Sequence, residues 1–304
     1  MGHLLTDYYV GTGGWAYFNV PGKSPLKAYG KIFKFVEVNY TFYQYPSTRT
    51  VEGWRSVVPK GFTFSVRCHQ QLTHQIGLKP TDEAYEAFYK TKNYADILET
   101  PYVVMETPVT YEADVDARNF LSGLNLKGVQ LVWEYRAPIT QSVTSLMQDF
   151  SVIQCVDLSR QKPAYNLEVA YTRLFGKGQH NIYEYTNDEL LDIQRQAEET
   201  GSKKVFMSYH GLRMNTDALR FQQHLQTGKF LPVTSATGLE SAKLVLAEDA
   251  AFPSSKSALI ESQGWKVIDV KENETAHLSK YLSALPERTY GNVEDVVKAL
   301  EAVL

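Results

Sequence analysis

Short apolar segments recur along most of the chain and alternate with more polar stretches. Eight of them run for four to seven residues and are rich in Val, Ile, Leu and aromatic side chains. Such nearly continuous apolar runs are typical of parallel strands that are buried on both faces. The predicted strands are residues 8–11, 35–39, 62–67, 102–106, 129–134, 152–157, 170–175 and 203–209.

Amphipathic segments between several of these strands predict helices. The clearest covers residues 79–98, where Thr81 precedes an acidic first turn, as at many helix N-termini. Residues 139–150 and 187–200 show the same one-sided pattern. Residues 158–167 are polar and contain a proline, so we expect an irregular loop there. Strands that alternate with helices predict a parallel sheet with right-handed crossovers.

Eight strands favour closure into a TIM-type (β/α)8 barrel, with an open doubly wound sheet as the alternative. The pattern changes after residue 232. We therefore expect an α/β chain with a barrel domain at residues 1–232 and a small C-terminal α/β extension at residues 233–304. In the extension, the predicted strands are residues 243–247 and 265–270, and the predicted helices are residues 252–263, 275–285 and 292–303.

Composition is compatible with a fold of this size. The chain has 304 residues, of which 43% are hydrophobic and 21% charged, enough for one barrel-sized core and a small appendage. Its net charge of -3 gives no support for a nucleic-acid partner. The first residues lack the features of a signal peptide, and no apolar run approaches the roughly 20 residues of a membrane span. Cys68 and Cys155 are expected to be reduced core thiols, and a cytoplasmic protein without a membrane partner is predicted.

Charged side chains lie at the ends of several predicted strands. The acids are Glu37, Glu134 and Asp157, and the arginines are Arg67, Arg136 and Arg173. Active sites of barrels lie at the carboxyl ends of the strands, so the three acids are predicted as catalytic residues. Buried ions cost several kcal/mol each unless they are paired and hydrogen-bonded. A structural salt-bridge network that closes the barrel is therefore the alternative to a polar ligand pocket.

The arginines indicate the chemistry of the ligand. Guanidinium groups suit bidentate capture of carboxylate or phosphate, so Arg67, Arg136 and Arg173 predict a small anionic ligand or a nucleotide. Gly176 lies in a Gly-Lys-Gly loop after the seventh strand, where barrels often bind phosphate. An ordinary turn explains that loop equally well.

Polar and aromatic residues in neighbouring loops complete the predicted ligand site. Asn39 and His69 share strand faces with the charged residues and are expected to contact the ligand. Trp15 follows a glycine-rich turn and is expected to cover the site. Tyr43 either stacks on a base or sugar ring or packs its loop onto the barrel. Ala16 stands where a dinucleotide-binding turn requires its third glycine, so no cofactor is predicted.

A metal site is an alternative use of the same strand ends. His69 and His74 could ligate zinc together with Glu134 or Asp157, as in barrels that cut phosphodiesters. His210, after the eighth strand, is a third candidate histidine. The spacing is not diagnostic and the first and fourth strands end without a histidine, so no metal ligand is predicted.

Several short motifs follow one another along the predicted barrel. They are Gly11-Thr12-Gly13-Gly14-Trp15, Val36-Glu37-Val38-Asn39-Tyr40-Thr41-Phe42-Tyr43, Trp54, Pro59, Phe62, Phe64, Thr73-His74, Glu134-Tyr135-Arg136, Asp157 and Arg173-Leu174-Phe175-Gly176. In this combination the chain resembles the DUF72 family, also called the YecE-like proteins, over roughly residues 7 to 225. The resemblance implies a TIM-type barrel and brings no established reaction with it.

The sequence departs from the family pattern at three positions. Ser is usual at Gly13, Gln is common at Glu106, and His is usual at Phe175. The last departure removes a polar group beside Arg173, which puts in doubt any activity that needs this histidine. The family barrel has been likened to phosphodiester-cleaving repair endonucleases, but fold analogy does not fix function.

Three functions fit these observations. The first is an enzyme, a hydrolase among the options, that acts on an anionic, phosphate-containing ligand at the carboxyl ends of the strands. The second is a metal-dependent phosphodiester-cleaving enzyme of the DNA-repair type. The third is a ligand-binding or partner module without catalysis. We prefer the first because acids and arginines converge with aromatic residues, whereas the acidic net charge argues against the second.

Overall fold

The computed structural model describes residues 6–302. The chain forms two compact units. The first consists of the residues up to Leu174 together with Gln196–Tyr209, and the second consists of Phe175–Arg195 together with the residues from His210 onward. Each unit is described separately below.

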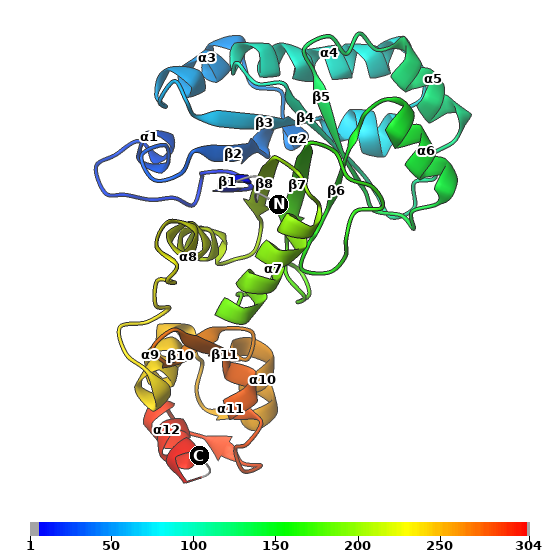
Figure 1. Ribbon diagram of the computed structural model, residues 1–304. Helices are drawn as coiled ribbons and strands as arrows, with labels where there is room; N and C mark the ends of the chain where they lie inside the picture. The colour runs from blue at the N-terminus through cyan, green and yellow to red at the C-terminus, as the bar shows by residue number, and fades with distance from the viewer. Residues whose placement is uncertain (1–5, 303–304) are drawn as a thin grey trace, which may run out of the picture. The chain divides into compact units, whose positions relative to one another are not determined.

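The first unit is built on eight parallel strands, as predicted (Figure 1). They are β1 (Asp7–Thr12), β2 (Phe35–Val38), β3 (Thr63–Arg67), β4 (Tyr102–Thr107), β5 (Gln130–Tyr135), β6 (Ile153–Val156), β7 (Val169–Leu174) and β8 (Lys204–Tyr209). Their hydrogen-bonded order is β1-β8-β7-β6-β5-β4-β3-β2, so the sheet is a nearly closed barrel with one seam between β1 and β2. The TIM-type barrel is therefore confirmed, and the doubly wound alternative is wrong.

Helices connect most of the strands. They are α1 (Pro25–Tyr29), α2 (Tyr40–Tyr43), α3 (Thr48–Ser56), a π-helix at Gln71–Ile76, α4 (Asp82–Ile97), α5 (Val115–Gly123), α6 (Gln141–Asp149) and α7 (Asn187–Glu199), which begins in the second unit. The predicted helix start at Thr81 is confirmed, because its side chain accepts a hydrogen bond from Ala84 N at 3.3 Å. Asn39, predicted as the end of the second strand, instead precedes α2 as its N-cap residue.

One tyrosine bridges the seam of the barrel. Thr12 N donates to Tyr29 Oη at 2.9 Å, and Tyr29 Oη donates to Phe35 O, also at 2.9 Å. A Cβ added to Gly11 would lie 2.0 Å from Phe35 O, so only glycine allows β1 to approach β2 this closely. The hydroxyl of Tyr29 thus connects backbone groups that the sheet ladder does not pair with each other.

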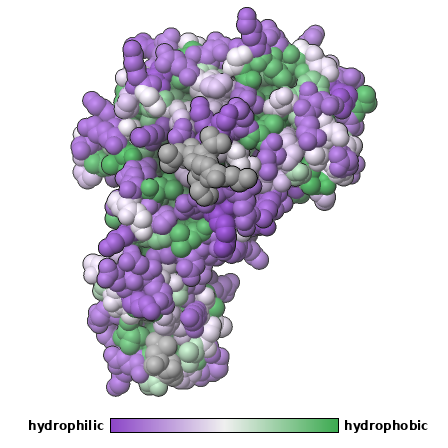
Figure 2. Space-filling view, viewed as in Figure 1, coloured by the Kyte–Doolittle hydropathy of each residue, from purple (hydrophilic) through white to green (hydrophobic). Residues whose placement is uncertain are grey.

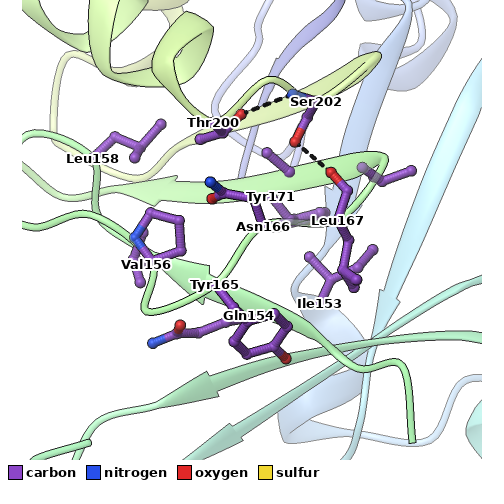
Figure 3. Close-up of a pocket in the computed structure, with 13 residues that line it drawn as sticks. Ile153, Gln154, Val156, Leu158, Tyr165, Asn166, Leu167, Tyr171, Thr200 and Ser202 are labelled. Atoms are coloured by element: carbon purple, nitrogen blue, oxygen red, sulfur yellow. Dashed lines mark hydrogen bonds between the residues drawn. The ribbon is translucent and has the colours of Figure 1, made fainter. Parts of the chain in front are cut away.

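The crossover between β6 and β7 is an irregular loop, as predicted for residues 158–167. Side-chain hydrogen bonds hold it: Ala164 N donates to Gln154 Oε1 at 2.6 Å, and Ser202 Oγ donates to Leu167 O at 2.7 Å. The cavity under this loop has a volume of about 20 Å³ (Figure 3). That is room for about one water molecule, so the cavity is a packing gap rather than a ligand pocket.

An apolar layer fills the barrel interior and sets the position of the charged residues. It consists of Phe35, Tyr102, Val104, Val132, Ile153, Cys155, Tyr171 and Phe206. Side chains two positions apart share one face of a strand. The residue two positions after Val104 is Glu106, and Glu134 follows Val132 in the same way. The apolar layer is therefore followed by a charged layer nearer the carboxyl ends of the strands.

The second unit combines helices with two small antiparallel sheets. It contains α8 (Met214–Thr227), α9 (Gly238–Asp249), β9 (Ser254–Ser255), α10 (Lys256–Gln263), β10 (Val267–Lys271), β11 (Glu274–His277), α11 (Leu278–Leu282), β12 (Thr289–Tyr290) and α12 (Val293–Glu301). β10 pairs with β11, and β9 pairs with β12. A hydrophobic core that includes Leu246, Leu259, Ile268 and Leu300 holds these elements together.

Two secondary-structure predictions in this unit are wrong. The predicted strand at residues 243–247 lies inside α9, where Ala242, Val245 and Leu246 are buried at helical spacing. The predicted helix at residues 275–285 is divided, because its first residues form β11 and pair with β10. The strand predicted at residues 265–270 and the helix predicted at residues 292–303 are confirmed. The proposed domain boundary near residue 232 stays a prediction.

Polar residues dominate the visible surface. On the face shown in Figure 2, hydrophilic residues cover most of the area and hydrophobic residues form separate small patches. No helix within residues 6–302 combines the length and the apolar character needed to cross a membrane.

Candidate functional site

Six charged residues meet at the carboxyl ends of the barrel strands. This glutamate–arginine cluster consists of Glu37, Arg67, Glu106, Glu134, Arg136 and Arg173. Five of them belong to strands β2, β3, β4, β5 and β7, and Arg136 directly follows β5. The structure therefore brings together five residues predicted for the site and adds Glu106.

Arg173 is the centre of the glutamate–arginine cluster. Its Nε lies 3.2 Å from Glu37 Oε1, and its Nη1 lies 2.5 Å from Glu106 Oε2. Nη1 also pairs with Glu134 Oε2. One guanidinium group thus binds carboxylates from three different strands, which fixes their relative positions.

The two other arginines extend the cluster. Arg67 pairs with Glu106 and donates to Asn39 Oδ1. Arg136 pairs with the Oε1 atoms of the two glutamates whose Oε2 atoms pair with Arg173. Its Nη1 lies 3.0 Å from Glu106 Oε1, and its Nε lies 3.0 Å from Glu134 Oε1. Three carboxylates and three guanidinium groups balance each other in formal charge, as a buried ionic network requires.

Solvent exposure divides the cluster into a buried part and an accessible edge. The side chains of Arg173, Glu37 and Glu106 are only 2%, 0% and 3% exposed. Arg136 is 37% exposed and Glu134 is 13% exposed. A ligand would therefore meet Arg136 and Glu134 first. Glu37 is fully buried, and its predicted catalytic role stays a prediction.

Glu134 and Arg67 keep their charges at neutral pH. Burial would raise the pKa of Glu134, but Arg173 and Arg136 outweigh burial and hold that pKa below its ordinary value. Burial, together with the nearby Arg173, lowers the pKa of Arg67 to about 10. Glu134 is therefore an anion at pH 7, and Arg67 is a cation.

A buried tyrosine orients Glu37 from below. Tyr171 Oη donates to Glu37 Oε2 at 2.8 Å and lies 2.7 Å from Ser65 Oγ. Because the single hydroxyl proton of Tyr171 points to the carboxylate, the hydroxyl of Ser65 donates to Tyr171. Burial, with Glu37 as the second cause, raises the pKa of Tyr171 well above its ordinary value, so the phenol stays protonated.

His74 joins the accessible edge from the π-helix Gln71–Ile76. Its Nε2 lies 3.9 Å from Glu106 Oε1, and its side chain is 28% exposed. Its Nδ1 lies 2.9 Å from Thr73 Oγ1. Burial lowers the pKa of His74 below 6.5 and outweighs the opposing effect of Glu106. A neutral imidazole next to a buried carboxylate is suited to accepting a proton.

Other residues predicted for the site make contacts within the loops around it. His69 stacks on Tyr45 at a centroid distance of 4.1 Å, and its Nε2 lies 3.3 Å from Tyr43 O. Trp15 packs edge-on against Trp54 at 5.2 Å. These residues surround the strand ends in the first unit, and their contact with a ligand stays a prediction.

Asp157 lies at the start of the irregular loop after β6. It accepts hydrogen bonds from Ser159 N at 2.9 Å and from Ser159 Oγ at 2.6 Å. Arg160 Nε lies 3.8 Å from its Oδ2. These contacts cap the loop, so they give Asp157 a structural task as well as the predicted catalytic one.

Gly176 belongs to the second unit. Its φ is +78°, and an added Cβ would lie 2.4 Å from the ring of Tyr183. Lys177, the next residue, pairs with Glu189 at 3.1 Å, and Phe175 stacks on His210 at 4.8 Å within the same unit. The backbone conformation and the close contact with Tyr183 therefore explain the glycine without a ligand, and the predicted role in phosphate binding stays a prediction.

The candidate metal ligands do not form a recognisable donor set. Within residues 6–302, no three His, Cys, Asp or Glu side chains are arranged so that they could hold a metal ion. Arginine side chains lie between the glutamates of the cluster, where a metal ion would otherwise compete for the same oxygens.

The second unit contains a separate groove of about 470 Å³. Lys229, Leu231, Thr237 and Lys271 are among its lining residues. Its buried carboxylate, Asp269, accepts a hydrogen bond from Thr234 N at 2.7 Å. This carboxylate is thus satisfied within the protein, but the volume is that of a small-molecule site.

Sequence reasoning missed Glu106, Tyr171 and Ser65 as members of the site. Strand parity carried the signal for two of them, because Tyr171 shares a face with Arg173, and Ser65 shares a face with Arg67. Glu106 lies one residue before the end of β4, as Glu134 does in β5, and the two residues are direct partners in the sheet.

A nearly closed (β/α)8 barrel with a charged cluster at the carboxyl ends of its strands defines the class of protein. The model of the family described as "Protein of unknown function DUF72" matches residues 9–238, and the chain belongs to this family. The expected family resemblance and barrel fold are therefore confirmed.

Individual relatives are more distant. The chain is 31% identical over 102 residues to the UPF0759 protein YunF of Bacillus subtilis (strain 168), an alignment that covers 31% of this chain and only 35% of that protein. A solved DUF72 family protein from Thermotoga maritima MSB8 is 19% identical, with a TM-score of 0.58 over 72% of this chain and 99% of that one. Another, from Enterococcus faecalis V583, is 16% identical, with a TM-score of 0.57 over 74% and 99%. Identities this low establish the fold alone.

Proposed function

We propose that this protein is an enzyme that acts on a small anionic ligand at the accessible edge of the glutamate–arginine cluster. The observation that carries the proposal is the graded exposure of the cluster. Arg136, His74 and Glu134 are 37%, 28% and 13% exposed, whereas Arg173 and Glu106 beneath them are 2% and 3% exposed. Buried charges hold the exposed ones in place, which is the arrangement of a preorganised site.

Each accessible residue has a distinct task in this proposal. Arg136 binds the anionic group, because its guanidinium combines permanent charge with the largest exposure in the cluster. Glu134 is ionised at neutral pH and acts as a general base. His74 is neutral and serves as a second proton-transfer group, oriented toward Glu106. Glu37 and Arg173 are positioning residues.

Burial of charged groups in this cluster costs free energy, and the stability of the fold does not require it. Replacing a buried ionic network by apolar residues is often neutral or stabilising by roughly 1–4 kcal/mol. A cluster of six charges above an apolar barrel layer is thus better explained by a ligand than by the fold. The metal-dependent alternative gains no observation in its favour from residues 6–302, where no suitable donor set occurs.

Calorimetric titration with inorganic phosphate tests the binding step. Phosphate should bind the unchanged protein, and Arg136→Gln should weaken binding at least about tenfold, since charged hydrogen bonds contribute about 1.5–3 kcal/mol. Arg118→Gln is the matched control, because Arg118 is also exposed and pairs with one aspartate at 2.8 Å. Equal affinity in both variants would contradict the assignment of Arg136.

Phosphate release from a chromogenic phosphomonoester tests the chemical step. We expect Glu134→Gln to abolish turnover while phosphate binding persists. Binding without turnover in the unchanged protein would instead favour a non-catalytic ligand-binding module. The aromatic Phe175 at the position where the family usually has histidine is the feature that keeps this second function open.

A further inference from the structure

Exposed aromatic side chains gather on the loops that follow two neighbouring strands. Within residues 6–302, the exposed Phe, Trp and Tyr residues are Tyr17 at 81%, Tyr40 at 47%, Tyr43 at 59% and Tyr89 at 39%. All but Tyr89 lie in the segments that directly follow β1 and β2. These segments leave the carboxyl ends of their strands, where the glutamate–arginine cluster also lies.

A chain of ring contacts connects Tyr43 with the accessible edge of the cluster. The rings of Tyr43 and Phe42 have their centroids 5.0 Å apart, and Phe42 packs edge-on against His74 at 5.1 Å. The guanidinium carbon of Arg67 lies 3.6 Å from the centroid of Phe42. Phe42 is thus covered by Arg67 and His74, whereas the side chain of Tyr43, next to Phe42, is 59% exposed.

Tyr43 is part of a larger aromatic surface in the first unit. Tyr40, three residues earlier on α2, packs edge-on against Trp54 at 6.0 Å, and Trp54 packs against Trp15 at 5.2 Å. Tyrosine and tryptophan are enriched at interfaces, and exposed apolar patches mark binding sites. Such a surface next to an anion site selects ligands that have both a ring and a charge.

We propose that the natural ligand combines an anionic group with a planar ring, as a nucleoside monophosphate does, and that Tyr43 stacks on the ring. This inference rests on the proposed anion site at Arg136 and names its substrate class. Aromatic side chains bind bases through their π-faces with little sequence preference, so the ring class follows from Tyr43 but the identity of the base does not.

Three probes separate ring recognition from anion recognition: adenosine, adenosine monophosphate and inorganic phosphate. Tyr43→Ala should weaken adenosine and adenosine monophosphate binding by about fivefold or more, and should leave phosphate binding unchanged. Tyr43→Phe keeps the ring and should bind within about twofold of the unchanged protein. Tyr89→Ala, at the exposed tyrosine on α4, is the matched control and should change none of the affinities.

The outcomes distinguish this inference from the proposed function. If adenosine monophosphate binds no tighter than phosphate, or if Tyr43→Ala and Tyr89→Ala behave alike, ring stacking at Tyr43 is overturned and the anion site stands. If Tyr43→Ala weakens adenosine but phosphate does not bind at all, the ring inference stands and the anion site at Arg136 is overturned. If none of the three probes binds, both are overturned.

Discussion

Arg173 Nε lies 3.2 Å from Glu37 Oε1, and the two side chains are 2% and 0% exposed. They come from β7 and β2, which are not neighbours in the order of the sheet, so the ion pair spans the barrel interior. The same guanidinium also binds Glu106 and Glu134. Arg173 is therefore the residue on which the geometry of the whole cluster depends.

Loss of this central charge should destabilise the protein strongly. Arg173→Met leaves three carboxylates close together without their common partner. We expect the free energy of unfolding at pH 7 to fall by about 3–5 kcal/mol, the usual effect of removing one partner of a buried ion pair. Urea denaturation measures this change. Arg118→Met, at an exposed pair, should change it by less than about 1 kcal/mol, and a similar loss in both variants would contradict the account.

Glu134 should make stability depend on pH in the acid range. Its pKa is lowered in the folded protein, so its contribution is fully present above the ordinary value of 4.5 and is lost as pH falls through the folded pKa. Denaturation series from pH 7 down to pH 3 should show this loss, and Glu134→Gln should make the curve shallower. Curves of identical slope for both proteins would be incompatible with an ionised, paired Glu134.

Glu189 gives a second acid transition in the other unit. Burial would raise its pKa, but hydrogen bonds from His277, Tyr183, Thr186 and Lys177 lower it to about 2. Its stabilising contribution should therefore be complete above pH 4.5 and decline toward pH 2. A carboxyl titration followed by NMR measures this pKa directly. A value near 4.5 would show that these hydrogen bonds do not persist in solution.

The stability of the barrel seam should depend on the hydroxyl group of Tyr29. Tyr29→Phe keeps the ring but leaves Thr12 N and Phe35 O without the group that now joins them. Unpaired buried polar groups cost about 1–3 kcal/mol, and we expect a decrease of that size in the free energy of unfolding. Hydrogen exchange of the Thr12 amide should accelerate more than that of amides in β4. Unchanged protection at Thr12 would mean that the seam is held in another way.

Local pattern was sufficient to predict the eight barrel strands, because buried parallel strands are short apolar runs with little ambiguity. It failed for residues 243–247, where Leu244, Val245 and Leu246 form an equally apolar run inside a helix. Only the wider spacing of buried residues, from Ala242 onward, separates the two cases.

The sequence predicts that charged residues lie near the strand ends, but it does not predict which of them are buried and which are exposed. Glu37 and Glu134 look alike in sequence, yet one is completely buried and the other reaches solvent. That difference arises from contacts between β2 and β7 across the barrel, which no local pattern records. Glu106 was missed for the same reason, since its importance comes from the arginines of three other segments.

A crystal structure of the protein with bound adenosine monophosphate would test the central claim most directly. The account predicts phosphate density at Arg136 within reach of His74, with the base against Tyr43 and the buried Arg173 unmoved. Density in the groove that contains Lys229 and Lys271, with the accessible edge of the cluster empty, would contradict it and transfer the ligand site to the second unit.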